Sequence, residues 1–258
     1  MTEAPAQSRP ACLVTRPQHQ SRALVELLEQ AGWQALLFPT IEIQPSPASA
    51  LLEQLPRRIH DYDIALFVSR NAVDFTFKYL QPGDIPASLQ LGVIGKGSWQ
   101  SLQQHGVESS IIPADSFNSE GLLASAALQQ VAGKRIIILR GQQGRNLLGD
   151  TLSARGATVD YQEVYRRCLP DYPAHHLEQL TRKNFPQLAI FTSAEGVQNT
   201  MQIVSATMAQ RLRQIPWLLI SERMRETARD LGHNATIIIA VSASDEGIVE
   251  AIKRWQQS

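Results

Sequence analysis

Short apolar runs alternate with amphipathic stretches along almost the whole chain. Residues 12–15 predict a strand, and residues 18–31 predict a helix whose leucines share one face and whose end is marked by Gly32. Strands alternating with helices of this length predict an α/β fold of parallel sheets with helices on both faces. Further strands are expected at 64–68, 91–94 and 110–112, with helices at about 71–80, 98–105 and 120–128. The alternation restarts at 134–139 and continues through 146–154, 188–191, 217–220 and 236–240 to a last helix at 246–255.

The two halves of the chain follow the same pattern at a nearly constant offset of about 124 to 126 residues. A fixed period of this length predicts two copies of one small domain. Because small molecules bind preferentially at domain interfaces, two similar lobes also predict a cleft between them that takes a ligand. Corresponding pairs are residues 13–16 with 137–140, 67–69 with 191–193, 93–94 with 219–220, and 120–121 with 246–247.

The alternation of strands and helices is interrupted at two equivalent places, residues 38–45 and 162–170. Both alternate apolar and polar side chains, and both end in proline. We interpret them as extended connectors between the lobes, which could pair with each other as a short antiparallel ladder.

Composition narrows the class of protein. Lys and Arg number 24, as do Asp and Glu, so no global field favours nucleic acid or an anionic membrane as a partner. The two cysteines, Cys12 and Cys168, form no CxxC pair, so we expect no metal cluster and a reducing, cytoplasmic location. Residues 1–10 contain no apolar signal segment, and the longest apolar run, 235–241, is too short to cross a bilayer.

The residues that follow each predicted strand are the candidates for a site, because ligands of open parallel sheets bind at the carboxyl ends of strands. Small hydroxylated residues recur there at helix starts. They act as N-caps, and helix amides of both lobes that face the cleft would bind anions; both roles can hold at once. Arg16 and Arg140 follow the first strand of each half, where they either clamp a carboxylate or are surface arginines or members of structural ion pairs. The candidate substrate-binding residues are Arg16, Ser69, Arg70, Asn71, Gly95, Ser98, Ser119, Arg140, Ser193, Ala194 and Ser221.

The sequence gives little support for nucleotide binding or for a serine-based catalytic triad. Residues 95–97 belong to a segment without the third glycine of a dinucleotide loop, and residues 141–144 are not followed by the lysine of a phosphate loop. The sequence contains no serine elbow and no plausible catalytic triad. Tyr165 is the candidate catalytic residue: it lies in a connector, as either a packed aromatic ring or a phenol that donates a proton within the cleft.

The ordered series of motifs resembles the uroporphyrinogen-III synthase family. The resemblance covers nearly the whole chain, from about residue 12 to residue 252. The motifs that carry it are Val14-Thr15-Arg16-Pro17, Phe67-Val68-Ser69-Arg70-Asn71-Ala72-Val73, Val93-Ile94-Gly95, Phe117-Asn118-Ser119-Glu120-Gly121-Leu122-Leu123, Leu139-Arg140, Val164-Tyr165-Arg166 and Phe191-Thr192-Ser193.

The resemblance implies two flavodoxin-like, internally duplicated lobes between which the chain crosses twice. Residues 1–38 and 170–258 would form one lobe, and residues 46–162 the other. Residues 39–45 and 163–169 would form the two-stranded β-ladder that joins them, with the cleft between the lobes.

The resemblance also implies the reaction. Linear hydroxymethylbilane loses water and closes with inversion of its terminal pyrrole, ring D, to give uroporphyrinogen III for haem biosynthesis. The substrate is thus a polycarboxylate, no cofactor or metal is implied, and Tyr165 matches the family's cleft tyrosine. A monomer in transient contact with the enzyme that makes hydroxymethylbilane fits this role. Ser98 stands where the family often has a threonine, whereas Ser221 and Met224 at the equivalent positions of the other half depart from that pattern.

Two rival functions remain open at this point. A non-catalytic two-lobe small-molecule binding or sensor module would have the same architecture. A transferase that uses a phosphorylated substrate lacks support because the phosphate-loop motifs are missing. Turnover of hydroxymethylbilane with isomer analysis of the oxidised porphyrin discriminates all three.

Overall fold

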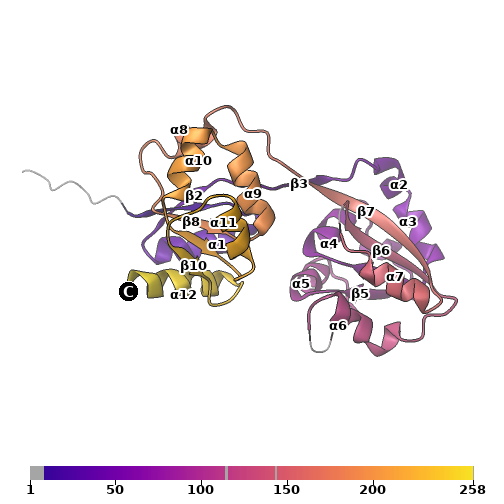
Figure 1. The fold of residues 1–258 in the computed structure, drawn as a ribbon. Coiled ribbons are helices and arrows are strands. Elements are labelled where there is room, and N and C mark those ends of the chain that lie inside the picture. The colour runs from indigo at the N-terminus through magenta and orange to yellow at the C-terminus, as the bar shows by residue number, and fades with distance from the viewer. Residues whose placement is uncertain (1–8, 114–115, 143, 258) are drawn as a thin grey trace, which may run out of the picture. The chain divides into compact units, whose positions relative to one another are not determined.

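A computed structural model describes residues 9–113, 116–142 and 144–257 of the chain. The chain forms two compact units (Figure 1). Unit 1 consists of Met1–Glu42 and Cys168–Ser258, and unit 2 consists of Ile43–Arg167. Unit 1 is therefore built from both ends of the chain, and unit 2 is built from its middle.

Unit 1 contains a parallel five-stranded sheet in the order β10-β9-β8-β1-β2. Successive residues of β1 point to opposite faces, so that Leu13 packs in one core with helices α9 to α11 and Val14 packs in another with α1 and α12. Gly32 follows α1 with a φ of 85°, as a C-terminal glycine should. The strands are β1 (Ala11–Val14), β2 (Gln34–Leu37), β8 (Leu188–Phe191), β9 (Trp217–Leu219) and β10 (Ile237–Ile239). The helices are η1 (Gln18–Gln20), α1 (Arg22–Gln30), α8 (His176–Leu180), α9 (Ala194–Ile203), α10 (Ala206–Arg213), α11 (Met224–Asp230) and α12 (Asp245–Gln256).

Unit 2 contains a second five-stranded sheet in the order β3-β7-β6-β4-β5, in which β7, β6, β4 and β5 are parallel. Its central strand is also buried on both faces: Ile137 packs toward α4 and α5, and Ile138 toward α6 and α7. The strands are β3 (Glu42–Pro45), β4 (Ile64–Phe67), β5 (Gln90–Val93), β6 (Arg135–Gly141) and β7 (Thr158–Cys168). The helices are α2 (Ser49–Glu53), α3 (Leu55–Arg58), η2 (Ile59–Asp61), α4 (Arg70–Thr76), η3 (Pro82–Asp84), α5 (Lys96–Gln104), α6 (Ser119–Ala124), η4 (Ala126–Leu128) and α7 (Leu147–Ala154).

The two sheets share part of their strand order. The neighbours β9-β8-β1-β2 of unit 1 follow one another as β5-β4-β6-β7 do in unit 2. The fifth strands differ. The strand expected at residues 110–112 is wrong: Ile111 forms only an isolated parallel bridge with Gly92. Pro113 follows directly and cannot donate to a ladder, and the Ser109 hydroxyl donates to the carbonyls of Leu91 and Ile111.

Parts of both expected connectors are strands of the unit 2 sheet. β3 lies beside β7, as the expected pairing of the two stretches requires, whereas residues 38–41 belong to no strand. β7 runs through residue 163 to Cys168 without interruption. Burial explains this, because Val164 is fully buried and Tyr165 is 5% exposed in the unit 2 core. The amide of Ser46 donates to the Val164 carbonyl at 3.2 Å, and Arg166 donates to the Gln44 side chain at 2.9 Å.

Among the described helices, none combines the length and apolar character that crossing a membrane requires.

Candidate functional site

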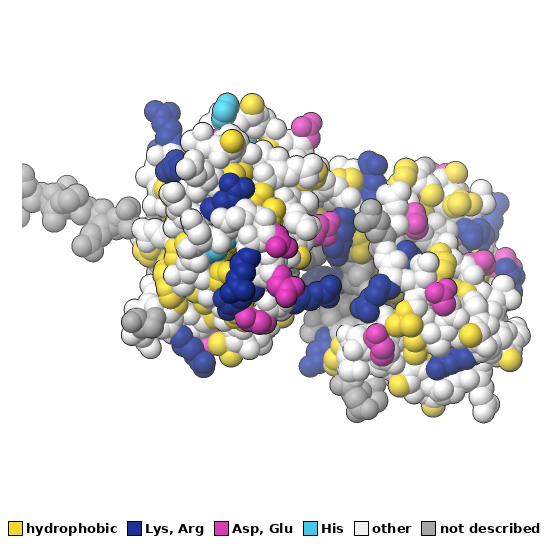
Figure 2. All heavy atoms as spheres, viewed as in Figure 1, with side chains coloured by type: hydrophobic (Ala, Val, Ile, Leu, Met, Phe, Trp, Pro, Cys, Tyr) yellow, Lys and Arg dark blue, Asp and Glu magenta, His cyan; other side chains and the backbone are white. Residues whose placement is uncertain are grey.

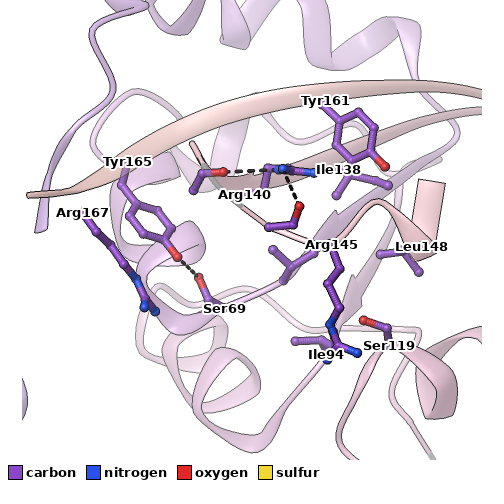
Figure 3. A pocket seen from close by; sticks show the side chains of 13 residues that line it. Ser69, Ile94, Ser119, Ile138, Arg140, Arg145, Leu148, Tyr161, Tyr165 and Arg167 are labelled. Carbon is purple, nitrogen blue, oxygen red and sulfur yellow. Dashed lines mark hydrogen bonds between the residues drawn. The ribbon is translucent and has the colours of Figure 1, made fainter. Parts of the chain in front are cut away.

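A pocket of about 240 Å³ opens at the carboxyl edge of the unit 2 sheet (Figure 3). It lies where β4, β5 and β6 end, beside β7 and the first turns of α6 and α7. This is the edge at which the sequence placed the ligand. Four sequence-predicted residues meet here, and three other polar residues join them. The polar side chains that line the pocket are Ser69, Ser119, Arg140, Arg145, Tyr161, Tyr165 and Arg167.

Ser69 and Tyr165 form a hydrogen-bonded pair in the pocket (Figure 3). The Ser69 hydroxyl caps α4 by accepting from the Ala72 amide at 3.0 Å, and it donates to the Tyr165 hydroxyl oxygen at 3.2 Å. The Tyr165 ring is buried and packs against Phe75, with ring centroids 5.9 Å apart. Tyr165 is therefore a packed aromatic whose hydroxyl reaches the pocket, and its role as a proton donor stays a prediction. Because its oxygen accepts from Ser69, the phenolic proton is not used in that bond.

A β-bulge and a glycine place the tyrosine ring. Arg140 pairs with Glu163, whereas the next residue, Gly141, pairs with Tyr165, so the register of β6 and β7 shifts here. A Cβ atom on Gly141 would lie 2.7 Å from Cζ of Tyr165. The Gln142 amide donates to the Tyr165 carbonyl at 2.9 Å, so the chain after β6 stays hydrogen-bonded to β7 in the shifted register. The close approach of ring and backbone therefore requires glycine at position 141.

Arg140 lines the pocket, but its guanidinium is engaged by its own loop. Nε donates to the Gly141 carbonyl at 3.2 Å, Nη2 to the Gly144 carbonyl at 3.1 Å and Nη1 to the Asn146 side chain at 3.1 Å. The guanidinium also lies over the Tyr161 ring, 4.7 Å from its centroid. These contacts shape the loop between β6 and α7.

Arg145, Arg167 and Tyr161 were not predicted from the sequence. Arg145 belongs to the loop after β6, and its guanidinium pairs with Glu120 at 3.6 Å. Tyr161 and Arg167 both belong to β7, but the bulge separates Tyr161 from Tyr165. The Tyr161 hydroxyl donates to the Asn146 carbonyl beside α7, whereas the Tyr165 ring packs with α4, so simple strand alternation could not have identified Tyr161 as a pocket residue. Among the described residues that line the pocket, three are arginines and none is acidic.

Four other predicted residues of unit 2 lie at helix starts but do not line the pocket. Arg70 and Asn71 open α4, where Arg70 pairs with Asp74 at 3.5 Å. Gly95 is the N-cap residue of α5, and Ser98 is buried in its first turn.

The predicted residues of unit 1 stand at the corresponding strand ends. Arg16 pairs with Asp245 at the start of α12, with 2.5 Å between Nη1 and Oδ1, so it has the structural ion pair that was one of its two alternatives. Ser193 caps α9 by accepting from the Gly196 amide at 2.9 Å, and Ala194 opens that helix. Ser221 is exposed in the turn that precedes α11.

On the face drawn in Figure 2, basic side chains lie among acidic and hydrophobic ones. In the part of the chain that the structure describes, no three His, Cys, Asp or Glu side chains come together as a metal site would need. The three arginines of the pocket are thus a local concentration of positive charge in a chain of zero net charge.

Comparison with known proteins identifies the family. Residues 22–250 match the family model described as uroporphyrinogen-III synthase HemD. The chain is 32% identical over 244 residues to the uroporphyrinogen-III synthase of Escherichia coli strain K12, which covers 93% of this chain and 99% of that protein. The chain belongs to the uroporphyrinogen-III synthase family. It is also 36% identical over 163 residues to the uroporphyrinogen-III synthase of Proteus mirabilis, covering 62% of this chain and 81% of that protein.

Solved structures of the same family share the fold. A mutant uroporphyrinogen III synthase of Thermus thermophilus matches with a TM-score of 0.61 at 18% identity, covering 96% of this chain and 99% of that one. The enzyme of Helicobacter pylori 26695 matches with a TM-score of 0.62 at 16% identity, with the same coverage. At these identities the likeness concerns the α/β fold with its two parallel-dominated sheets, as the sequence predicted.

Proposed function

We propose that this chain catalyses the uroporphyrinogen-III synthase reaction of haem biosynthesis. It closes hydroxymethylbilane with inversion of ring D and loss of water, as a lyase that needs no cofactor. Family membership across nearly the full length carries the proposal, because relatives named for this activity align over 93% of the chain. The pocket at the carboxyl edge of the unit 2 sheet supports it, since its arginines suit a polycarboxylate.

The reaction depends on how the protein positions the substrate more than on covalent catalysis. Hydroxymethylbilane is reactive and cyclises unaided to the wrong isomer, so the site must hold the chain so that ring D attacks through its substituted carbon. Orientation and exclusion of water provide this selectivity. Tyr165 then donates the proton that the departing hydroxyl requires. Its phenolic proton is free of the Ser69 bond, which supports this role.

The unit 2 pocket takes only part of the substrate. Its volume of about 240 Å³ lies below the roughly 300–1,000 Å³ of typical ligand pockets. We propose that the two units are copies of one module, the lobes of the expected duplicated fold, and that unit 1 supplies further contacts through Arg16, Ser193, Ala194 and Ser221. Arg70, Asn71, Gly95 and Ser98 would act through the backbone at their helix starts.

The test is turnover of hydroxymethylbilane followed by isomer analysis of the oxidised porphyrin. We expect the type III isomer to predominate with the protein, whereas a reaction without protein gives the type I isomer. A protein that binds the tetrapyrrole but leaves the isomer ratio at that of the uncatalysed reaction would be a binding or sensor module.

We further propose that the chain works as a monomer in the cytoplasm and takes its substrate from the enzyme that makes hydroxymethylbilane. The sequence has only two cysteines, Cys12 and Cys168, and no CxxC pair, which fits a reducing compartment. Sedimentation at micromolar concentration tests the oligomeric state, and a salt-sensitive complex with that enzyme would test the contact.

A further inference from the structure

Arg145 differs from the other loop arginine in what holds it. Arg140 makes three hydrogen bonds to the loop between β6 and α7 and is fixed there. Arg145 extends along the pocket toward Ser119 of α6 (Figure 3), and its ion pair is with the neighbouring Glu120. Arg145 lines the pocket, and Glu120 is not among the residues that do.

The ion pair between Arg145 and Glu120 is weak enough to exchange. Its nitrogen and oxygen are 3.6 Å apart, and the two side chains are 75% and 56% exposed. Exposed pairs of this kind contribute at most about 1 kcal/mol, because water and salt screen them. A second carboxylate that reaches the guanidinium from the pocket could bond it with both oxygens, a stronger contact than the single long one to Glu120.

We propose that Arg145 binds a carboxylate side chain of the tetrapyrrole and that Glu120 competes with it for the same guanidinium. The inference rests on the proposed function, which supplies the polycarboxylate. In the free protein Glu120 takes the place of the substrate carboxylate; on binding, the guanidinium turns from Glu120 to the ligand. Arg145 thus binds the substrate and raises its affinity, whereas Glu120 lowers that affinity by competing for the guanidinium.

A competitor predicts effects of opposite sign at the two positions. Arg145→Gln removes the ligand's partner and should raise the dissociation constant by about fivefold, while Arg145→Lys restores part of the loss as a point charge. Glu120→Gln removes the competitor and should lower the dissociation constant by about two- to threefold. In the Arg145→Gln background, Glu120→Gln should change nothing, because there is no guanidinium left to release.

The measurement is a titration with uroporphyrin III, the oxidised octacarboxylate, followed by tryptophan fluorescence, together with kcat and KM for hydroxymethylbilane. The affinity changes should appear in KM, with kcat within twofold of wild type. Glu26→Gln and Arg22→Gln are matched controls, because that exposed pair on α1 has a glutamate equally exposed at 56% and the same charge changes. Both side chains of the test pair are exposed, and melting temperatures within about a degree of wild type would show that the variants fold.

Each result decides between the alternatives. An unchanged dissociation constant in Arg145→Gln, or a Glu120→Gln effect of equal size with and without Arg145, overturns the inference and leaves the proposed function standing if type III product still forms. If the dissociation constants shift as expected but the protein makes no type III product, the carboxylate site is supported and the proposed function is rejected.

Discussion

Tyr165 combines a buried ring with a hydroxyl that reaches the pocket. Tyr165→Phe keeps the packing and removes the phenolic oxygen, so the loss of one hydrogen bond should cost about 0.5–1.5 kcal/mol of stability. Turnover should fall without being abolished: general-acid assistance is typically worth about 10²- to 10⁴-fold, and solvent or a neighbouring group replaces part of it while positioning remains. The product should stay predominantly type III, since the phenol does not hold ring D alone.

Isomer-resolved turnover and urea unfolding of the same preparations check this prediction. Phe75→Leu is a suitable comparison, because it alters the packing against the Tyr165 ring without touching the hydroxyl. Wild-type turnover in Tyr165→Phe would remove the tyrosine from the chemistry.

The two cysteines differ in accessibility. Cys12 is fully buried in β1, and this burial raises the pKa of its thiol to about 12. The thiolate is the reactive species, so Cys12 should resist alkylation at pH 8 while the protein is folded. Cys168, at the end of β7, is partly exposed and should react first. Mass spectrometry after brief iodoacetamide treatment should find one labelled site, Cys168, and two after denaturation. Early labelling of Cys12 would contradict this.

At the scale of elements, the junction of β6 and β7 is the most constrained part of the site. Gly141→Ala would place a Cβ atom 2.7 Å from the Tyr165 ring, and both the ring and the backbone are held. Such overpacking costs about 1–3 kcal/mol. The displaced ring should also lower turnover, so the variant should lose stability and activity together.

Gly83→Ala serves as the control, because a Cβ there meets no atom within 4 Å. We expect its unfolding midpoint to stay within experimental error of wild type. A Gly141→Ala protein as stable as wild type would mean that the bulge adapts and does not fix the tyrosine.

Sequence pattern predicted the elements whose residues are buried on both faces. The strands at 12–15, 64–68, 91–94 and 188–191 are confirmed within a residue or two, because nearly all of their residues are buried and the sequence there is largely apolar. Gln34–Leu37 was missed: as an edge strand it is partly exposed, and its pairing with β1 depends on tertiary context.

Sequence pattern could predict site residues only where they directly follow a predicted strand. Ser69 and Arg140 follow predicted strands directly, and the structure places both at the pocket. Arg145 sits in a loop whose course depends on the hydrogen bonds of Arg140, which no local pattern reveals. The equivalent Arg16 has a different partner, Asp245, so the repeat predicted the positions of the two arginines but not their contacts.

At the scale of the whole molecule, each unit has its own pair of cores. Two buried clusters belong to unit 1 and two to unit 2, one on either face of each sheet. Units of this size can bury enough apolar surface to fold, so the stability of each depends mainly on its own core. A titratable group within one core therefore affects the acid stability of the protein.

His233 is such a group. Its ring packs on Trp217 with centroids 4.1 Å apart, and Nε2 lies 3.0 Å from the Ile215 carbonyl oxygen, which can only accept. The proton of the neutral ring therefore sits on Nε2, and Nδ1 is buried with no hydrogen-bond partner among the described residues. Protonation would place a charge and an unpaired N–H in the core, and this desolvation lowers the pKa of His233.

A histidine whose pKa is lower in the folded state takes up its proton more readily when the chain unfolds. Its contribution to stability is complete above the unfolded pKa of about 6.5 and is lost as pH falls through the folded pKa. The free energy of unfolding should therefore decline as pH drops from 7 to 5. His233→Gln keeps a donor for the Ile215 carbonyl but does not titrate, so this decline should be shallower, although the variant should lose about 1 kcal/mol at pH 7.5 with the aromatic contact. Urea unfolding at several pH values measures both, with the exposed His60→Gln as control. If the free energy of unfolding declined equally with falling pH in His233→Gln and in wild type, His233 would not be the group that destabilises the protein in acid.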